Sequence, residues 1–251
     1  MKSKLTLVGA GPGDKDLITF KGIKVLQRAN VVLYDALVNE EILQFIKPGA
    51  IKVFVGKRGG KPSFPQEKIN QLIVSYGLIY GEVVRLKGGD PFIFGRGYEE
   101  ISFAKKNGFE TEVVPGISSS TGLTAINNIS LTKRSVSDGF WVLTASKVGN
   151  EFNNDIVLAA QSKSTVVILM GVRKLAEIVD LYKGYGKYDL PVLIIQNGSR
   201  PDQKLVRGNV STITYLAAKN EVAAPAIIVL GEVLNEKSEN EILTETANYL
   251  N

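Results

Sequence analysis

The chain has 251 residues, with 30 Lys and Arg against 25 Asp and Glu, and it contains neither cysteine nor histidine. Its length suits one large domain or two small ones, and 44% hydrophobic with 22% charged residues is a globular composition. The lack of cysteine excludes disulfides, thiolate nucleophiles and iron–sulfur clusters. The lack of histidine excludes a Ser-His-Asp triad, an imidazole base and an ordinary zinc site. Any catalysis must use Asp, Glu, Lys, Tyr, Ser, backbone groups or a cofactor.

The net charge of +5 suits anionic partners, and much of it lies in one stretch. Residues 42–66 carry five cations and no acidic residue, and this basic stretch includes a glycine-rich loop at 56–60. A solvated face remains the alternative to a binding surface there. No apolar run approaches the roughly 20 residues of a membrane helix, and residues 1–4 lead directly into a strand pattern rather than a signal peptide. We expect a soluble, cytoplasmic protein that binds neither membrane nor nucleic acid, because no nucleic-acid recognition motif is present.

In the first half, short apolar runs alternate with helical patterns. Strands are predicted at 5–9, 31–34, 51–55, 82–86 and 110–114, and helices at 16–29, 40–46, 65–76, 98–107 and 118–127. Asn39 is expected to cap the second helix, and Pro65 suits the first turn of the third. This order predicts a mostly parallel sheet with helices on both faces.

The second half repeats this class of pattern. Strands are predicted at 140–144, 166–170, 192–196 and 227–230, an edge strand at 204–207, and helices at 153–160, 172–181, 211–219 and 239–249. A polar break near 128–132 places the domain boundary, so we expect one domain at 1–130 and another at 131–251. Two α/β domains without a long linker suggest a ligand cleft between them.

The loop from Val8 to Asp14 follows the first predicted strand and contains three glycines. Glycine permits a tight turn and a close approach of the backbone to a ligand. Together with Asp35 at the end of the second strand, the loop invites a dinucleotide-binding interpretation. Two residues argue against it, because Asp14 replaces the third fingerprint glycine and Pro12 removes a backbone donor. A tight structural turn remains the alternative.

The loop from Arg85 to Glu100 holds four glycines, two arginines and a proline, and it follows the fourth strand. Open α/β sheets bind ligands at this carboxyl edge, which favours a binding loop over a plain connector. The Gly-Lys-Ser/Thr ending of a P-loop is absent. A third loop, from Val113 to Gly122, opens a helix with hydroxyl residues. These could meet a polar ligand group or could cap the helix, and the segment alone does not separate the two.

The order of these loops resembles the tetrapyrrole methylases. The runs that carry the resemblance are GAGPGD (9–14), VVLYD (31–35), VGKRGG (55–60), RLKGGDPFIFGRG (85–97) and VVPGIS (113–118). Matching runs follow in the second half, namely LMG (169–171), NGSRPDQ (197–203) and PAIIVLG (225–231). The resemblance therefore covers essentially the whole chain.

The resemblance implies two αβα domains with mostly parallel or mixed sheets, a homodimer, and S-adenosyl-L-methionine bound in the interdomain cleft. It assigns catalytic and substrate loops to the N-terminal domain, and cofactor and dimer contacts to the C-terminal domain. The implied activity is transfer of two methyl groups to ring carbons of uroporphyrinogen III, an anionic tetrapyrrole. The products would be precorrin-2, for siroheme or cobalamin synthesis, and S-adenosyl-L-homocysteine.

The family's site residues carry over position by position. The implied acid–base residues are Asp35 and Lys57, and no metal is required because the sulfonium makes the methyl group electrophilic. The implied cofactor contacts are Pro12, Gly88, Gly89, Asp90, Ile93, Ser118, Ser119, Met170 and Gly198, with Ala226 as a further candidate. Cations that could meet the substrate carboxylates are Arg58, Lys61, Arg85, Arg96, Lys133 and Arg134.

The chain departs from the family where relatives usually carry histidine. Pro62, Lys133 and Ser146 stand at those positions, and of the three only Lys133 can still bind a propionate. These departures leave two alternatives open. One is a methylase of a different precorrin or another heterocycle, and the other is a regulatory protein that binds the cofactor without turnover.

Overall fold

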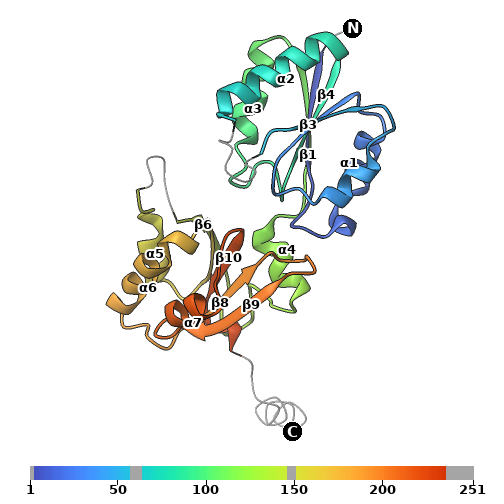
Figure 1. Ribbon diagram of the computed structural model, residues 1–251. Coiled ribbons are helices and arrows are strands. Elements are labelled where there is room, and N and C mark those ends of the chain that lie inside the picture. Colours follow the sequence, from blue (N-terminus) through green and yellow to red (C-terminus); the bar gives the residue numbers. More distant parts are fainter. Residues whose placement is uncertain (1–2, 57–63, 146–150, 236–251) are drawn as a thin grey trace. The chain divides into compact units, whose positions relative to one another are not determined.

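A computed structural model describes residues 3–56, 64–145 and 151–235 of the chain. The contacts divide the chain into two compact units, Met1–Ile126 with Asn197–Gln203, and Asn127–Gln196 with Lys204–Asn251 (Figure 1). Lys57, Arg58, Lys61, Pro62 and Ser146 fall outside the described residues, as does the helix predicted at 239–249.

The first unit contains a five-stranded sheet with the order β3-β2-β4-β1-β5. Its strands are β1 (Lys4–Gly9), β2 (Val31–Tyr34), β3 (Ile51–Phe54), β4 (Glu82–Lys87) and β5 (Glu110–Val114). All neighbouring strands pair in parallel. Their carboxyl ends therefore meet at one edge of the sheet, and the glycine-rich loops all leave from that edge.

Helices cover both faces of this sheet, as Figure 1 shows. They are α1 (Phe20–Leu26), α2 (Gln66–Tyr80) and α3 (Gly97–Lys106), with the 3-10 helices η1 (Lys15–Leu17) and η2 (Glu40–Phe45). A further helix, α4 (Ser119–Ile126), follows β5 and contributes no residue to the two core clusters of this sheet. One core cluster packs α1 and η2 against Val32, Val84 and Leu86, and the other packs α2 and α3 against Leu33 and Val83. Successive strand residues thus feed opposite cores, as the period of two requires.

The second unit contains a mixed sheet with the order β6-β7-β10-β8-β9. Its strands are β6 (Phe140–Thr144), β7 (Thr165–Leu169), β8 (Pro191–Gln196), β9 (Lys204–Asn209) and β10 (Ala226–Leu230). Its helices are α5 (Asp155–Gln161), α6 (Leu175–Gly184) and α7 (Ile213–Lys219), with η4 (Val172–Lys174) and η5 (Glu232–Leu234). Only β6 and β7 pair in parallel, and the other described pairs are antiparallel.

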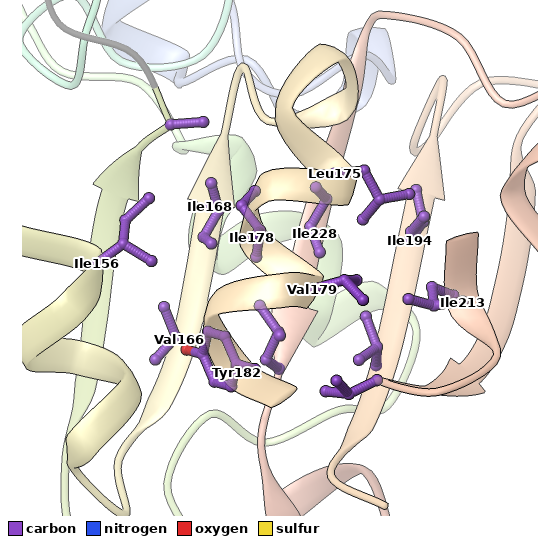
Figure 2. Packing of buried hydrophobic residues seen from close by; sticks show 14 of the residues in the cluster. Ile156, Val166, Ile168, Leu175, Ile178, Val179, Tyr182, Ile194, Ile213 and Ile228 are labelled. Carbon is purple, nitrogen blue, oxygen red and sulfur yellow. The ribbon is translucent and has the colours of Figure 1, made fainter. Parts of the chain in front are cut away.

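The core of the second unit is apolar and lies between its sheet and its helices (Figure 2). Ile168, Ile194 and Ile228 project from three neighbouring strands toward Ile178 and Val179 of α6. Burying such branched side chains contributes about 1.5–3 kcal/mol each relative to exposure. This packing explains why the short apolar runs of the second half form strands.

The predicted αβα class with parallel and mixed sheets is confirmed. The strands predicted at 31–34, 110–114 and 140–144 have the observed bounds, and the predicted edge strand is β9 at the edge of its sheet. The helix predicted at 16–29 was wrong as a single helix, because two caps divide it. Asp14 accepts a hydrogen bond from the Asp16 N–H and begins η1, and Thr19 accepts one from the Gly22 N–H and begins α1.

Asn39 caps its helix as predicted, by accepting a hydrogen bond from the Glu41 N–H, although that helix is 3-10 rather than α. The helix predicted at 65–76 begins one residue later, at Gln66, with Pro65 at its N-cap rather than in its first turn, and it extends to Tyr80. Within the described ranges, none of the helices has both the length and the apolar character that crossing a bilayer requires.

An ion-pair cluster in the first unit gives a stability test. Lys21 and Lys4 hold Glu112 at 2.6 and 2.7 Å, and their hydrogen bonds lower its pKa from 4.5 to about 2. A carboxylate whose pKa is lower in the folded than in the unfolded protein stabilises the fold at pH values above its unfolded-state pKa. That stabilisation is lost as the pH falls toward the folded-state pKa. We expect Glu112→Gln to lower the free energy of unfolding by about 1 kcal/mol or less at pH 7.

Urea unfolding at pH 7 and pH 3 checks this expectation. The gap between wild type and Glu112→Gln should be smaller at pH 3, because protonation removes part of the wild-type advantage. Glu67→Gln, an exposed carboxylate in the first turn of α2, is the matched control. An equal difference in unfolding free energy between wild type and Glu112→Gln at both pH values would contradict the lowered pKa of Glu112.

Candidate active site

The loops after β1 and β4 are joined by backbone hydrogen bonds at the carboxyl edge of the first sheet. The Gly89 N–H donates to the Gly11 carbonyl at 2.7 Å, and the Gly11 N–H donates back at 3.3 Å. Both glycines have positive φ, +80° for Gly11 and +65° for Gly89. Glycine adopts this backbone region without the strain other residues would carry.

The loop after β5 packs against the same backbone. A Cβ on Gly9 would lie 2.5 Å from Gly116 Cα, and a Cβ on Gly116 would overlap the Gly89 carbonyl oxygen. Three loops that are distant in sequence thus meet backbone to backbone. A side chain at Gly9 or Gly116 would force them apart, which is why a close approach requires glycine there.

Asp90 ties two of these loops together through its carboxylate. Its Oδ1 accepts a hydrogen bond from the Phe92 N–H at 2.8 Å, and its Oδ2 accepts one from the Gly116 N–H at 3.0 Å. Hydrogen bonds to a charged acceptor contribute about 1.5–3 kcal/mol. Asp90 therefore shapes the surface formed by the loops after β4 and β5.

The start of α4 and the segment 197–203 complete this edge of the first unit. The Asp14 N–H donates to Ser199 Oγ at 2.8 Å, and a Cβ on Gly13 would lie 2.5 Å from the Gly198 carbonyl oxygen. Ser118 Oγ accepts a hydrogen bond from the Ser120 N–H at 3.3 Å. Ser118 thus makes the helix-capping contact that its sequence position allowed.

A buried charge network lies beneath the loops, on the side of the sheet covered by α2 and α3. Arg85 on β4 donates from Nη2 to Asp35 Oδ2 and from Nε to Glu100 Oε1, both at 3.1 Å. Lys87 Nζ lies 3.2 Å from Glu100 Oε1 and 3.1 Å from Oε2. Two cations therefore face two carboxylates, and the described network is formally neutral.

Burial disfavours the charged form of Lys87 in this network. Burial lowers the pKa of Lys87, the nearby Arg85 cation lowers it further, and Glu100 opposes both effects. Gln66 adds a neutral donor, because its Nε2 lies 3.2 Å from Glu100 Oε1. Removing one member would leave another charge buried and uncompensated, which is strongly destabilising.

Arg96 lies on the surface at the start of α3. It forms a two-pronged contact with Glu99, with Nε at 2.8 Å and Nη2 at 2.6 Å from the two carboxylate oxygens. The hydrogen bond from Arg96 lowers the pKa of Glu99. Arg96 also has a positive φ of +58°, as does Phe94 at +52°. The backbone before α3 is thus held in a conformation that is costly for residues other than glycine.

The first unit contains most of the site residues predicted from the sequence. The loops at its carboxyl edge hold Pro12, Asp35, Gly88, Gly89, Asp90, Ile93 and Ser118, Ser119 begins α4, and Gly198 lies in the segment 197–203, which follows β8 and packs with this unit. Met170 and Ala226 belong to the second unit. There the antiparallel register of β7 and β10 pairs Leu169 with Ile227, so Met170, just after β7, and Ala226, the first residue of β10, lie at the same end of these two strands.

Lys133 and Arg134 also belong to the second unit. They lie in a turn in which the Lys133 N–H donates a hydrogen bond to the Ser137 carbonyl at 2.9 Å.

Arg85 was expected to meet a substrate carboxylate. The structure instead gives its side chain 4% exposure and places its guanidinium between Asp35 and Glu100. Lys87 and Glu100 are not among the site residues predicted from the sequence. The available signal was the spacing of Val83, Arg85 and Lys87, which at two residues apart share one face of a strand at the centre of the sheet.

The fold and this edge define a class of protein, and comparison with known proteins identifies the class. Residues 4–214 match the family described as Tetrapyrrole (Corrin/Porphyrin) Methylases, and the chain belongs to that family. It is 41% identical over 237 residues to the uroporphyrinogen-III C-methyltransferase of Methanocaldococcus jannaschii, covering 94% of this chain and 98% of that protein.

Two further proteins are similar over nearly the whole chain. The siroheme synthase of Actinobacillus pleuropneumoniae serotype 7 (strain AP76) is 45% identical over 234 residues, which is 92% of this chain but 47% of that protein. The chain therefore spans about half the length of that relative. The uroporphyrin-III C-methyl transferase of Thermus thermophilus, solved in complex with S-adenyl homocysteine, superimposes with a TM-score of 0.79 at 37% identity. That superposition covers 92% of this chain and 98% of the other.

The loop contacts predict the effect of a single methyl group. We expect Gly116→Ala to lower the free energy of unfolding by about 1–3 kcal/mol, because its Cβ would overlap the Gly89 carbonyl oxygen and the backbone must shift. Urea unfolding measures the change. Gly184→Ala is the control, because a Cβ there meets nothing within 4 Å. Equal stabilities of the two variants would show that the loops do not pack as described.

Proposed function

We propose that the protein transfers methyl groups from S-adenosyl-L-methionine to two ring carbons of uroporphyrinogen III. The products are precorrin-2 and S-adenosyl-L-homocysteine, in siroheme or cobalamin synthesis. The observation that carries the proposal is the likeness to a uroporphyrinogen-III C-methyltransferase over almost the full length of both proteins. The carboxyl-edge loops of the first unit support it, because they combine glycine backbone, an acidic residue and hydroxyls in one place.

The residues at this edge fit such a cofactor. Phe92, Ile93 and Phe94 are exposed and follow Asp90 after the buried Pro91, and they offer apolar surface to a nucleoside. The Ser118 and Ser119 hydroxyls and the loop amides offer polar partners to an amino-acid tail. When bound, the cofactor supplies an electrophilic methyl group on sulfur. The part of the protein is to hold and orient, and positioning alone can contribute about 7–11 kcal/mol to a barrier.

Asp35 is the proton acceptor in this proposal. Once a ring carbon has gained the methyl group, the macrocycle must lose a proton from another of its atoms to recover neutral bonding, and the chain has no histidine to accept it. The Asp35 carboxylate is already oriented, because the Leu37 N–H donates to Oδ1 and Arg85 donates to Oδ2, each at 3.1 Å. Its side chain remains 23% exposed, so a substrate atom can reach it. Lys57 stays a prediction, as a proton donor or a carboxylate anchor.

The substrate is polyanionic, and the proposed cations match it in charge. Arg96, Lys133 and Arg134 can pair with carboxylates, and an arginine can do so with two parallel hydrogen bonds. Arg58 and Lys61 stay predictions of the same kind. The homodimer, the cytoplasmic location and the assignment of catalytic loops to one domain and cofactor and dimer contacts to the other are also proposals from family resemblance.

Incubating the purified protein with uroporphyrinogen III and methyl-labelled S-adenosyl-L-methionine tests the function. We expect two labelled methyl groups in each macrocycle, identified by mass spectrometry. Cofactor binding without label in any tetrapyrrole would overturn the proposal in favour of a regulatory protein. Label entering only a different precorrin would overturn the choice of substrate and retain the class of reaction.

Asp90→Ala tests whether the loop after β4, which contains Asp90, binds the cofactor. We expect the dissociation constant for S-adenosyl-L-homocysteine, measured by calorimetry, to rise about tenfold or more. The variant loses two charge-assisted hydrogen bonds and any direct contact of the carboxylate with the ligand. Asp180→Ala, exposed on α6, serves as the control. An unchanged dissociation constant for Asp90→Ala would refute a cofactor role for this loop.

A further inference from the structure

The central strand β4 carries charge where its neighbours carry core residues. Val83 belongs to the apolar cluster under α2 and α3, and Arg85 and Lys87 continue the same face of the strand. On β2, Leu33 is opposite Arg85 and Tyr34 is opposite Leu86 in the parallel register. Asp35 is the next residue, so the register brings its carboxylate to the charged end of β4.

Exposure within the network is graded toward the loops. The side chain of Glu100 is 0% exposed, those of Arg85 and Lys87 are 4% and 6% exposed, and that of Asp35 is 23% exposed. Asp35 is thus the member of this network that solvent or a ligand can best reach. The others are buried behind it, between β4 and the helices α2 and α3.

Stability alone is a weak reason for such a network. Replacing a buried ion network with apolar residues of similar volume is often neutral or stabilising, so the network calls for a reason other than stability. Here the fixed geometry belongs to the Asp35 carboxylate. The Arg85 guanidinium is a planar fork that can bind Glu100 with Nε, the Leu86 carbonyl with Nη1 and Asp35 with Nη2 at the same time.

We propose that Arg85, anchored by Glu100, is a positioning residue that sets the orientation of the Asp35 carboxylate for proton acceptance. This inference rests on the proposed function, in which Asp35 receives the proton. In this proposal Asp35 and not Arg85 meets the substrate, because the Arg85 side chain is only 4% exposed and that of Asp35 is 23% exposed. Glu100 holds the guanidinium from behind, and Lys87 and Gln66 hold Glu100.

A double-mutant cycle on kcat tests the proposal. Arg85→Lys keeps the positive charge but loses the fork, and we expect kcat to fall about 10–100-fold while the KM for uroporphyrinogen III changes less than about twofold. Asp35→Glu keeps a carboxylate but moves it by one methylene. If Arg85 acts through Asp35, the double variant has nearly the same kcat as Asp35→Glu alone.

Two results would overturn the inference. One is a double variant whose loss of kcat equals the product of the two single losses, because that result means Arg85 acts independently of Asp35. The other is an Asp35→Glu variant with wild-type kcat, because then Asp35 has no carboxylate geometry for Arg85 to set. Arg28→Lys is the matched control and should retain wild-type kcat, since Arg28 is exposed and lies near Glu82 and Glu112 instead.

Folding and function are separated within the same experiment. Should Arg85→Lys fail to fold, Glu100→Asp replaces it in the cycle, because this change keeps the negative charge beside both cations but draws the anchoring carboxylate back from Arg85 by one methylene. The same non-additive kcat is expected, and additive losses count against the inference. If the wild type itself transfers no methyl group, the proposed function fails. If the wild type is active and the cycle is additive, the positioning role alone fails.

Discussion

The parallel register of the first sheet is the constraint on which the candidate site depends. Parallel strands end at a common edge, so four loops that are distant in sequence leave the sheet side by side. At that edge Gly11 and Gly89 exchange backbone hydrogen bonds, and Gly9 and Gly116 lie too close for either to carry a side chain. Antiparallel pairing would send half of these loops to the opposite edge. The surface that they form is therefore a consequence of strand direction.

The same register explains why charge is tolerated inside the first unit. Arg85 and Lys87 continue a core face of β4, and their cost of burial is offset because Asp35 and Glu100 supply opposite charges within 3.2 Å. Among the described residues, the buried charged side chains are Arg85, Lys87 and Glu100, and all three belong to the first unit. This distribution associates the buried ions with the carboxyl edge where the loops gather.

Much of the fold could be predicted from the sequence, because strands and loops leave local signals. Apolar runs located the described strands, and glycine, proline and polar residues marked the loops. The fate of Arg85 could not be predicted in this way. An arginine in a glycine-rich segment has the same sequence signature whether it faces a substrate or a buried carboxylate, and its partner Glu100 is identified only once α3 packs on β4. The division of the helix at 16–29 depended on caps by Asp14 and Thr19, which compete locally with helical continuity.

A crystal structure of the protein with S-adenosyl-L-homocysteine would test most directly whether these loops form the methyl-transfer site. The result expected is the ligand held against the loop containing Gly88, Gly89 and Asp90, with the Asp35 carboxylate open on its free side and still bound by Arg85. A ligand bound away from the carboxyl edge of the first sheet, or an Asp35 side chain turned away from the ligand's sulfur, would contradict this assignment.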